Sequence, residues 1–98
     1  MPSGIVFDPV FGDLEKAMKI AAAKQSVISH NIANANTPGF EKLEFDEELN
    51  RAVRSNEKVS IEKEMAALSN NSINYASYVK ILSAKLNNLK TIATQGRR

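Results

Sequence analysis

The last third of the chain carries an unusually long heptad pattern. Between residues 60 and 95 there is no proline or glycine, and nine of ten positions spaced alternately by four and three residues are apolar. These seam positions are Ile61, Met65, Leu68, Ser72, Tyr75, Val79, Leu82, Leu86, Leu89 and Ala93. Ser60 is a suitable N-cap, and Glu62 and Glu64 suit the first helical turn. The pattern predicts one helix over residues 60–95.

A second, shorter heptad pattern fills residues 12–36. Six of its seven seam positions are apolar, and they are Leu14, Met18, Ala21, Gln25, Ile28, Ile32 and Ala35. Asp13 is the expected N-cap. The helix is expected to stop before Pro38, because a proline disfavours helical backbone at the preceding Thr37. Pro38 and Gly39 then suit the central positions of a type II turn.

The two remaining segments have weaker patterns. Residues 1–11 hold two prolines and a glycine, which predict an irregular N-terminal arm. In the middle, apolar residues recur at helical spacing from Phe45 to Val53, and the acids at 46–48 suit a first helical turn. We therefore expect a loop and one short helix over residues 37–59.

The length of the C-terminal pattern decides the fold class. A helix over residues 60–95 would be about 54 Å long, whereas a compact domain of this size has a radius of gyration of about 13 Å. We expect a single all-α domain over residues 1–98, an elongated hairpin of two long helices with coiled-coil-like packing and a short loop or helical middle. Burial of one apolar stripe offsets less free energy than ordering so long a helix costs. Other chains are therefore expected to cover it.

The composition removes most catalytic and metal-binding classes. The 98 residues include no cysteine and a single histidine, His30, so a disulfide, a thiolate zinc site and a histidine metal cluster are not expected. Adjacent helix residues point in different directions, which argues against Ser29 and His30 as a nucleophile–base pair. The four glycines are isolated and suggest no phosphate-binding loop. We expect no enzyme activity, no cofactor and no small-molecule substrate.

The charge is modest overall but unevenly distributed. The net charge is +2, made up of −3 over residues 41–64, +5 over residues 65–98 and zero before them. An acidic middle and a basic end suit stacking of copies of the chain. The basic end leaves a nucleic-acid-binding helical protein as an alternative, and the heptads equally fit a cytosolic coiled-coil adaptor or an export chaperone. The sequence has no apolar run long enough to predict a membrane span. Its N-terminus lacks the basic and then apolar regions of a secretory signal peptide.

The end of the first helical pattern carries a specific motif. The residues that form it are Asn31, Ile32, Ala33 and Asn34, followed after two positions by Thr37, Pro38, Gly39 and Phe40. This stretch resembles the signature of the bacterial flagellar axial proteins, the rod and hook family, in which an Ala-Asn-Asn-Ile-Ala-Asn helix end precedes Thr-Pro-Gly and an aromatic residue. Ser29 and His30 depart from that pattern. Residues 59–65, 71–75 and 85–90 resemble the closing helix of a small proximal-rod member.

The resemblance implies a non-enzymatic structural subunit of the basal-body rod. Such proteins leave the cell through the flagellar type III export apparatus without a cleaved signal, and polymerise with copies of themselves and with other rod proteins below a membrane-ring adaptor. Their terminal helices pair into an inner coiled-coil layer and commonly fold on assembly. No nucleic acid is implied.

The heptad patterns and the motif together give roles to residues. The motif would fix the exit of the first helix. The residues expected to hold the helices and their neighbours are Leu14, Met18, Ile28, Ile32, Leu68, Tyr75, Val79, Leu82, Leu86 and Leu89. Two features depart from the family pattern: the segment between Phe40 and Val59 is short, and the arm before the first helix is long.

Overall fold

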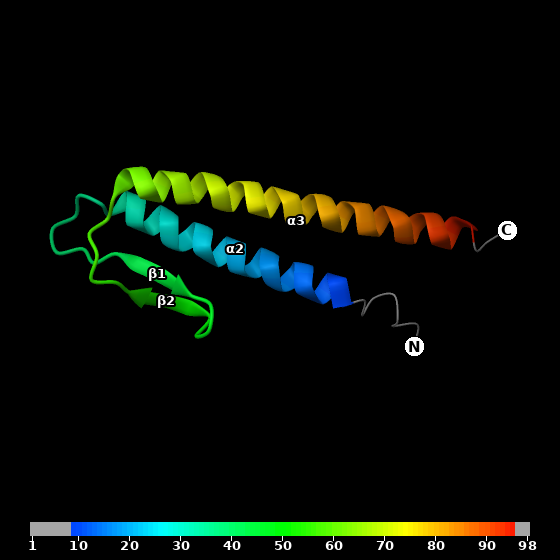
Figure 1. Ribbon diagram of the computed structural model, residues 1–98, viewed down its shortest axis with the longest axis horizontal. Coiled ribbons are helices and arrows are strands. Elements are labelled where there is room, and N and C mark those ends of the chain that lie inside the picture. The colour runs from blue at the N-terminus through cyan, green and yellow to red at the C-terminus, as the bar shows by residue number, and fades with distance from the viewer. Residues whose placement is uncertain (1–8, 96–98) are drawn as a thin grey trace.

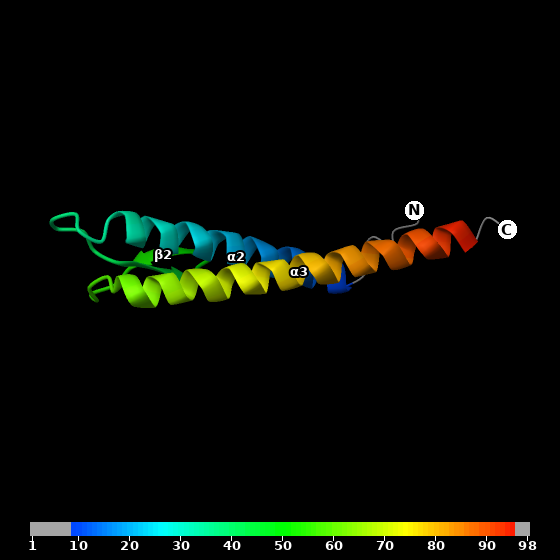
Figure 2. The same ribbon diagram turned by 90° about the horizontal axis from the view of Figure 1, so that it is seen from above.

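Two long antiparallel helices and a small strand pair make up the computed structural model, which describes residues 9–95 (Figure 1). In chain order the elements are α2 (Pro9–Ala33), β1 (Leu43–Asp46), β2 (Arg51–Arg54) and α3 (Ile61–Gln95). The two helices lie side by side, and the strand pair lies against the C-terminal half of α2 (Figures 1 and 2). The expected elongated hairpin of two long helices is confirmed.

Helix α2 begins and ends three residues earlier than the sequence pattern indicates. Pro9 suits the first helical position, because its φ is preset and the first N–H groups of a helix have no partner within it. Asp13, the expected N-cap, therefore lies inside the helix. At the other end the side-chain amide of Asn34 donates a hydrogen bond to the carbonyl of His30 at 2.9 Å, which satisfies one of the last free carbonyls. Residues 1–8 of the expected arm lie outside the described residues.

The predicted type II turn follows α2. The N–H of Phe40 donates to the carbonyl of Thr37 at 3.1 Å, and Gly39 has a φ of 75°. This left-handed φ is the one that the third position of a type II turn requires. Pro38 supplies the preset φ of the second position.

Two glycines offer a matched test of this backbone requirement. A Cβ atom added at Gly12 or at Gly39 would meet nothing within 4 Å, so steric clashes are not a factor at either position. Gly12→Ala, inside α2, should raise the free energy of unfolding by about 0.5–1 kcal/mol. Gly39→Ala should lower it by about 1–2 kcal/mol, since an L-residue is strained at this φ. Urea denaturation measures both, and effects of the same sign would contradict the assignment.

The middle segment forms a β-hairpin, so the expected short helix over this region is wrong. Strands β1 and β2 are antiparallel, with Leu43 opposite Arg54. The N–H of Ser55 donates to the carbonyl of Lys42 at 2.8 Å and extends the pairing. Leu43 and Phe45 are both half-buried and line a hollow against α2. Their two-residue spacing is that of a strand. The helical spacing of the apolar residues from Phe45 to Val53, on which the expected helix was based, is coincidental.

The hairpin closes through a four-residue loop that contains a left-handed asparagine. Asn50 has a φ of 53°, a conformation that asparagine tolerates better than most residues. The carboxylate of Asp46 accepts a hydrogen bond from the N–H of Leu49 at 3.1 Å, which fixes the first part of the loop. The acids predicted to begin a helix here instead begin a turn.

The molecule is long and thin. Its principal extents are 66 × 24 × 13 Å and its radius of gyration is 18.5 Å, well above the value of about 13 Å for a compact chain of this length. Helix α3 is about 52 Å long and α2 about 38 Å. Because the helices are antiparallel and α3 is the longer, the C-terminal part of α3 continues past the start of α2 (Figures 1 and 2).

Few of the described side chains are buried. Leu14 and Ala21 are the buried apolar residues, and both face α3 from α2. The other buried residues in the described part of the chain are polar, namely Asn31, Glu64 and Asn71. The centre of the helix pair is thus organised by hydrogen bonds as much as by apolar packing.

Candidate functional site

Asn31 joins three elements at the closed end of the hairpin. Its side chain is 1% exposed. The amide oxygen accepts the N–H of Leu43 at 2.9 Å, and the amide nitrogen donates to the carbonyl of Leu43 at 2.8 Å. The same nitrogen donates to the carboxylate of Glu64 in α3 at 3.4 Å. One asparagine of α2 therefore serves as an extra strand partner for β1 and also contacts α3.

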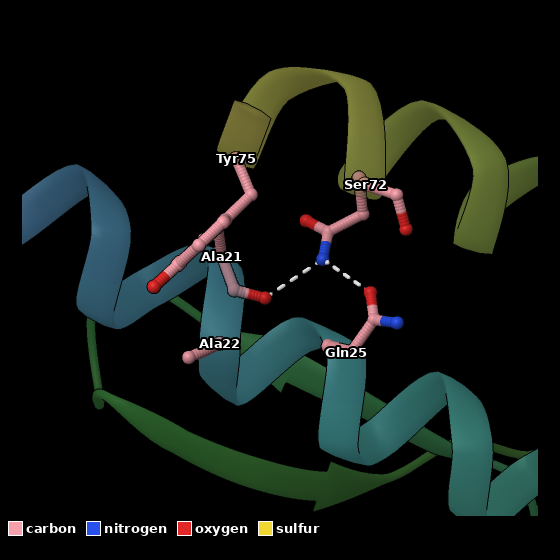
Figure 3. Close-up of a pocket in the computed structure, with 6 residues that line it drawn as sticks. Ala21, Ala22, Gln25, Ser72 and Tyr75 are labelled. Atoms are coloured by element: carbon pink, nitrogen blue, oxygen red, sulfur yellow. Dashed lines mark hydrogen bonds between the residues drawn. The ribbon is translucent and has the colours of Figure 1, made fainter. Parts of the chain in front are cut away.

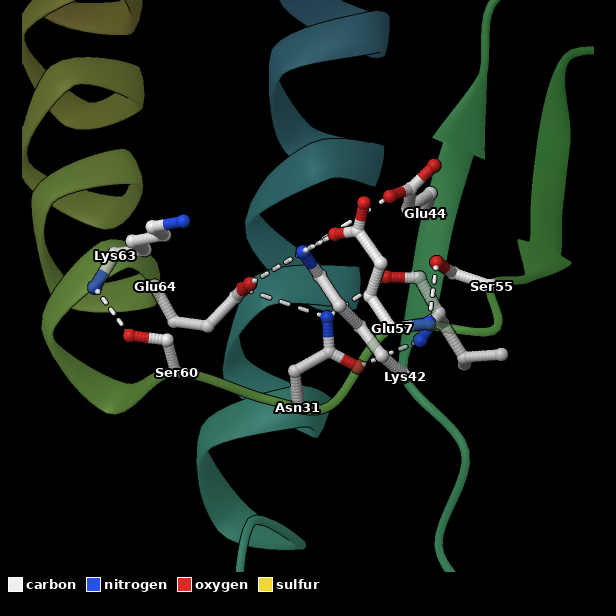
Figure 4. A network of polar contacts seen from close by, with 9 residues as sticks. Asn31, Lys42, Glu44, Ser55, Glu57, Ser60, Lys63 and Glu64 are labelled. Atoms are coloured by element: carbon white, nitrogen blue, oxygen red, sulfur yellow. Dashed lines mark hydrogen bonds and ion pairs between the residues drawn. The ribbon is translucent and has the colours of Figure 1, made fainter.

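Lys42 completes this polar cluster (Figure 4). Its ammonium lies 3.4 Å from the carboxylate of Glu64, 3.6 Å from that of Glu57 and 3.9 Å from that of Glu44. The Lys42 and Glu64 side chains are only 16% and 6% exposed. Desolvation lowers the pKa of Lys42, but the hydrogen bond to Glu64 and the charges of all three carboxylates outweigh it and raise this pKa. Glu64, expected only as an acid in the first helical turn, is a buried partner of Asn31 and Lys42.

Asn71 is a second buried polar contact, near the middle of the helix pair. Its amide nitrogen donates to the backbone carbonyl of Ala21 at 2.7 Å and to the side-chain oxygen of Gln25 at 3.0 Å. The small side chain of Ala21 lets α3 approach closely enough for a side chain to reach the backbone of α2. Polar contacts at heptad positions of this kind fix the register of paired helices. Glu64 and Asn71 are seven residues apart and occupy the same heptad position.

The remaining motif residues build the turn after α2. Asn34 accepts the hydroxyl of Thr37 at 3.3 Å, and its backbone carbonyl accepts the Thr37 N–H at 2.9 Å. The Phe40 ring lies 5.3 Å from the His30 ring in a tilted arrangement. Ile32 is half-buried, whereas Ala33, Thr37, Pro38 and Gly39 are exposed. The motif thus has two parts, a buried clamp at Asn31 and an exposed turn.

The predicted seam residues fall into two groups. On α2, Leu14 is buried and Met18, Ile28 and Ile32 are half-buried. On α3, Leu68, Leu82 and Leu89 are half-buried, whereas Tyr75, Val79 and Leu86 are exposed. All four predicted seam residues of α2 are therefore at least half-buried, whereas three of the six on α3 are open to solvent.

The open part of the α3 seam borders a groove along the helix pair. One hollow of about 350 Å³ is lined by small residues and Tyr75 (Figure 3), and its lining comprises Ala21, Ala22, Gln25, Asn71, Ser72 and Tyr75. A second hollow of about 430 Å³ shares Ala22 and Tyr75 with the first and extends to Phe11, Leu14 and Leu82. The two hollows adjoin at Ala22 and Tyr75 and are largely apolar, and we call them together the open groove.

Sequence reasoning missed the residues that organise the interior. Glu64 and Asn71 lie outside the apolar stripe of α3 through Ile61 and Met65, which was the expected contact face, and Lys42 belongs to neither helix. The available signal was a neighbouring stripe with the same spacing, in which the polar residues at 64 and 71 alternate with Leu68.

The described residues show no site for catalysis by a metal. No group of three His, Cys, Asp or Glu side chains within residues 9–95 is placed to hold a metal ion. In the same range neither helix is both long enough and apolar enough to cross a membrane. What the arrangement offers is a register-fixed helix pair with one open groove.

Comparisons of the sequence with known proteins find flagellar rod proteins. The family model for the flagella basal body rod protein matches residues 14–40, which include the Asn31 clamp and the turn after it. The flagellar basal body rod protein FlgB of Bacillus subtilis (strain 168) is 30% identical over 127 aligned residues, covering 94% of this chain and 98% of that protein. FlgB of Buchnera aphidicola subsp. Acyrthosiphon pisum (strain APS) is 35% identical over 51 residues, covering 50% of this chain and 38% of that protein.

The alignment to the Bacillus protein is longer than this chain. It spans 127 positions, more than the 98 residues present here, so that protein carries residues that this chain lacks. The agreement still extends over nearly the whole of both sequences, and the motif at residues 31–40 lies inside the family match. The chain therefore belongs to the flagellar basal body rod protein family, as a relative of FlgB.

Proposed function

We propose that this chain polymerises with copies of itself through its two helices and forms part of the drive shaft of the flagellum. Family membership makes it a structural rod component of the basal body, a location where it assembles with other rod proteins. The finer proposal is that α2 and α3 form the inner helical layer of a tube. Passage through the flagellar export apparatus without a cleaved signal, a periplasm-spanning position and contact with the membrane-ring adaptor belong to the same proposal.

The observation that carries the proposal is the exposure of apolar side chains along α3. Large apolar residues of this helix that remain substantially exposed are Ile61, Met65, Ile73, Tyr75, Val79, Ile81, Leu86 and Ile92. In contrast, only Leu14 and Ala21 are buried apolar residues in the described part of the chain. Apolar surface of this extent, spread along a rod-shaped molecule, is typical of a protein–protein contact surface. Neighbouring helices of other copies would cover it.

The test is the behaviour of the purified chain over a range of concentrations. Analytical ultracentrifugation should show species larger than a monomer as the concentration rises. Far-UV circular dichroism should show more helix per residue in the same series, because packing of the apolar face stabilises long helices. A chain that stays monomeric with constant helicity and a cooperative thermal transition would overturn self-assembly.

A further inference from the structure

We propose that copies of this chain join head to tail, with the terminal segment of α3 on one copy docked against the closed, acidic end of the next. The terminal segment is residues 85–95, and the closed end comprises the first turns of α3 together with Lys42, Glu44 and Glu57. This proposal rests on the proposed self-assembly and adds which surfaces meet.

The terminal segment presents apolar and positive groups together. It lies where α3 continues past the start of α2 (Figure 1). Leu86 and Ile92 are 52% and 58% exposed. On the same segment Lys90 is exposed and Lys85 is half-buried, and no acidic residue follows Glu64 in the sequence. A surface of this kind suits an apolar partner that carries carboxylates.

The closed end presents the matching groups. Ile61 and Met65 in the first turns of α3 are 47% and 52% exposed. Beside them lies Glu62, and three carboxylates share the single ammonium of Lys42. Two of these carboxylates, on Glu44 and Glu57, are more than half exposed. Within the closed end the four carboxylates of Glu44, Glu57, Glu62 and Glu64 outnumber the two ammonium groups of Lys42 and Lys63.

Geometry makes the contact intermolecular. The two surfaces lie at opposite ends of one continuous helix, about 52 Å long, which cannot fold back on itself. Each copy offers one surface of each kind, so the contact between copies is heterologous. A heterologous contact that does not close into a ring generates an open filament. A second copy of this chain is therefore the partner that the charges and the shape select.

Charge reversals at the two ends test this contact. One variant, K85E/K90E, makes both ends acidic, and a second, E57K/E62K, makes both ends basic. Each should weaken self-association by about tenfold or more, because two attractive charge contacts become repulsive. A chain that combines all four substitutions should associate like the wild type. An equimolar mixture of the two double variants should co-assemble although neither associates alone.

The measurements are sedimentation at a fixed ionic strength, with circular dichroism on every variant to verify the helix content. If the wild type associates and the reversals change nothing, or the combined variant stays as weak as either double variant, the head-to-tail contact is overturned while self-assembly stands. If K85E/K90E weakens association but E57K/E62K does not, the head-to-tail contact is also overturned, because the basic end then binds another anionic surface. A wild type that remains monomeric overturns the proposed self-assembly and this contact together.

Discussion

Asn31→Asp is expected to release the strand pair from the helices. A carboxylate cannot donate the 2.8 Å hydrogen bond to the carbonyl of Leu43, so this buried acceptor loses its partner. The new charge would also lie where the amide nitrogen now contacts the Glu64 carboxylate at 3.4 Å. Lost pairing and buried like charges together should lower the free energy of unfolding by about 3–4 kcal/mol. Chemical denaturation measures this loss.

Hydrogen exchange locates the same effect within the chain. The amide of Leu43 donates to the Asn31 oxygen, and its exchange should accelerate strongly in the variant as the hairpin detaches. The matched control is Asn34→Asp, the same substitution about one helical turn later. The Asn34 amide also donates to a backbone carbonyl, but that contact is exposed to solvent, so its loss should cost less than about 1 kcal/mol. Equal losses in the two variants would contradict the clamp.

The sequence predicted the helices well because their signal is repeated many times. Ten seam positions lie in α3 and six in α2, so one polar exception in each, Ser72 and Gln25, does not obscure the periodicity. The ends were less certain, because a single residue decides them. Helix α2 begins at Pro9, whose φ is preset, and ends before Asn34, whose side chain binds a free backbone carbonyl. A pattern of apolar residues carries no information on either effect.

The hairpin could not be predicted from periodicity because its stability comes from outside its own segment. Four-residue strands such as β1 and β2 have little intrinsic stability as an isolated pair. Here β1 is held by Asn31, which lies twelve residues before Leu43 in the chain. The motif that contains Asn31 was expected to fix the exit of the chain from α2. The pairing of its first asparagine with a strand became visible only in the folded arrangement.

The choice of contact face on α3 shows the other limit of sequence reasoning. Two neighbouring stripes share the helix, one through Met65 and Leu86 and one through Glu64 and Asn71. The first is more apolar, and the second faces α2. Polar residues can be buried where each finds a partner, and no buried side-chain nitrogen or oxygen in the described residues lacks one. A search for apolar periodicity therefore selects the stripe through Met65 and Leu86, which does not face α2 and remains open to other chains.

Leu86→Asp is expected to abolish assembly and swimming without unfolding the chain. Leu86 is 52% exposed, so its replacement should change the free energy of unfolding of the isolated chain by no more than about 0.5 kcal/mol. In an assembled rod the same position would bury a carboxylate against apolar neighbours. An unpaired buried charge costs several kcal/mol at each copy, about the whole strength of a weak contact between subunits.

The matched control is Ser83→Asp, which adds the same charge three residues earlier on the exposed surface of α3, outside the terminal segment of residues 85–95. Its position lies beside the apolar stripe rather than on it, so assembly and swimming should persist. Both variants are produced in cells that lack the wild-type protein, and swimming in soft agar and the amount of protein in isolated basal bodies are compared. Thermal unfolding of the purified chains separates a defect in assembly from one in folding. Wild-type swimming of the Leu86→Asp cells would show that the α3 stripe is not a subunit contact. A carboxylate buried at such a contact would have no partner on an apolar surface and would prevent assembly.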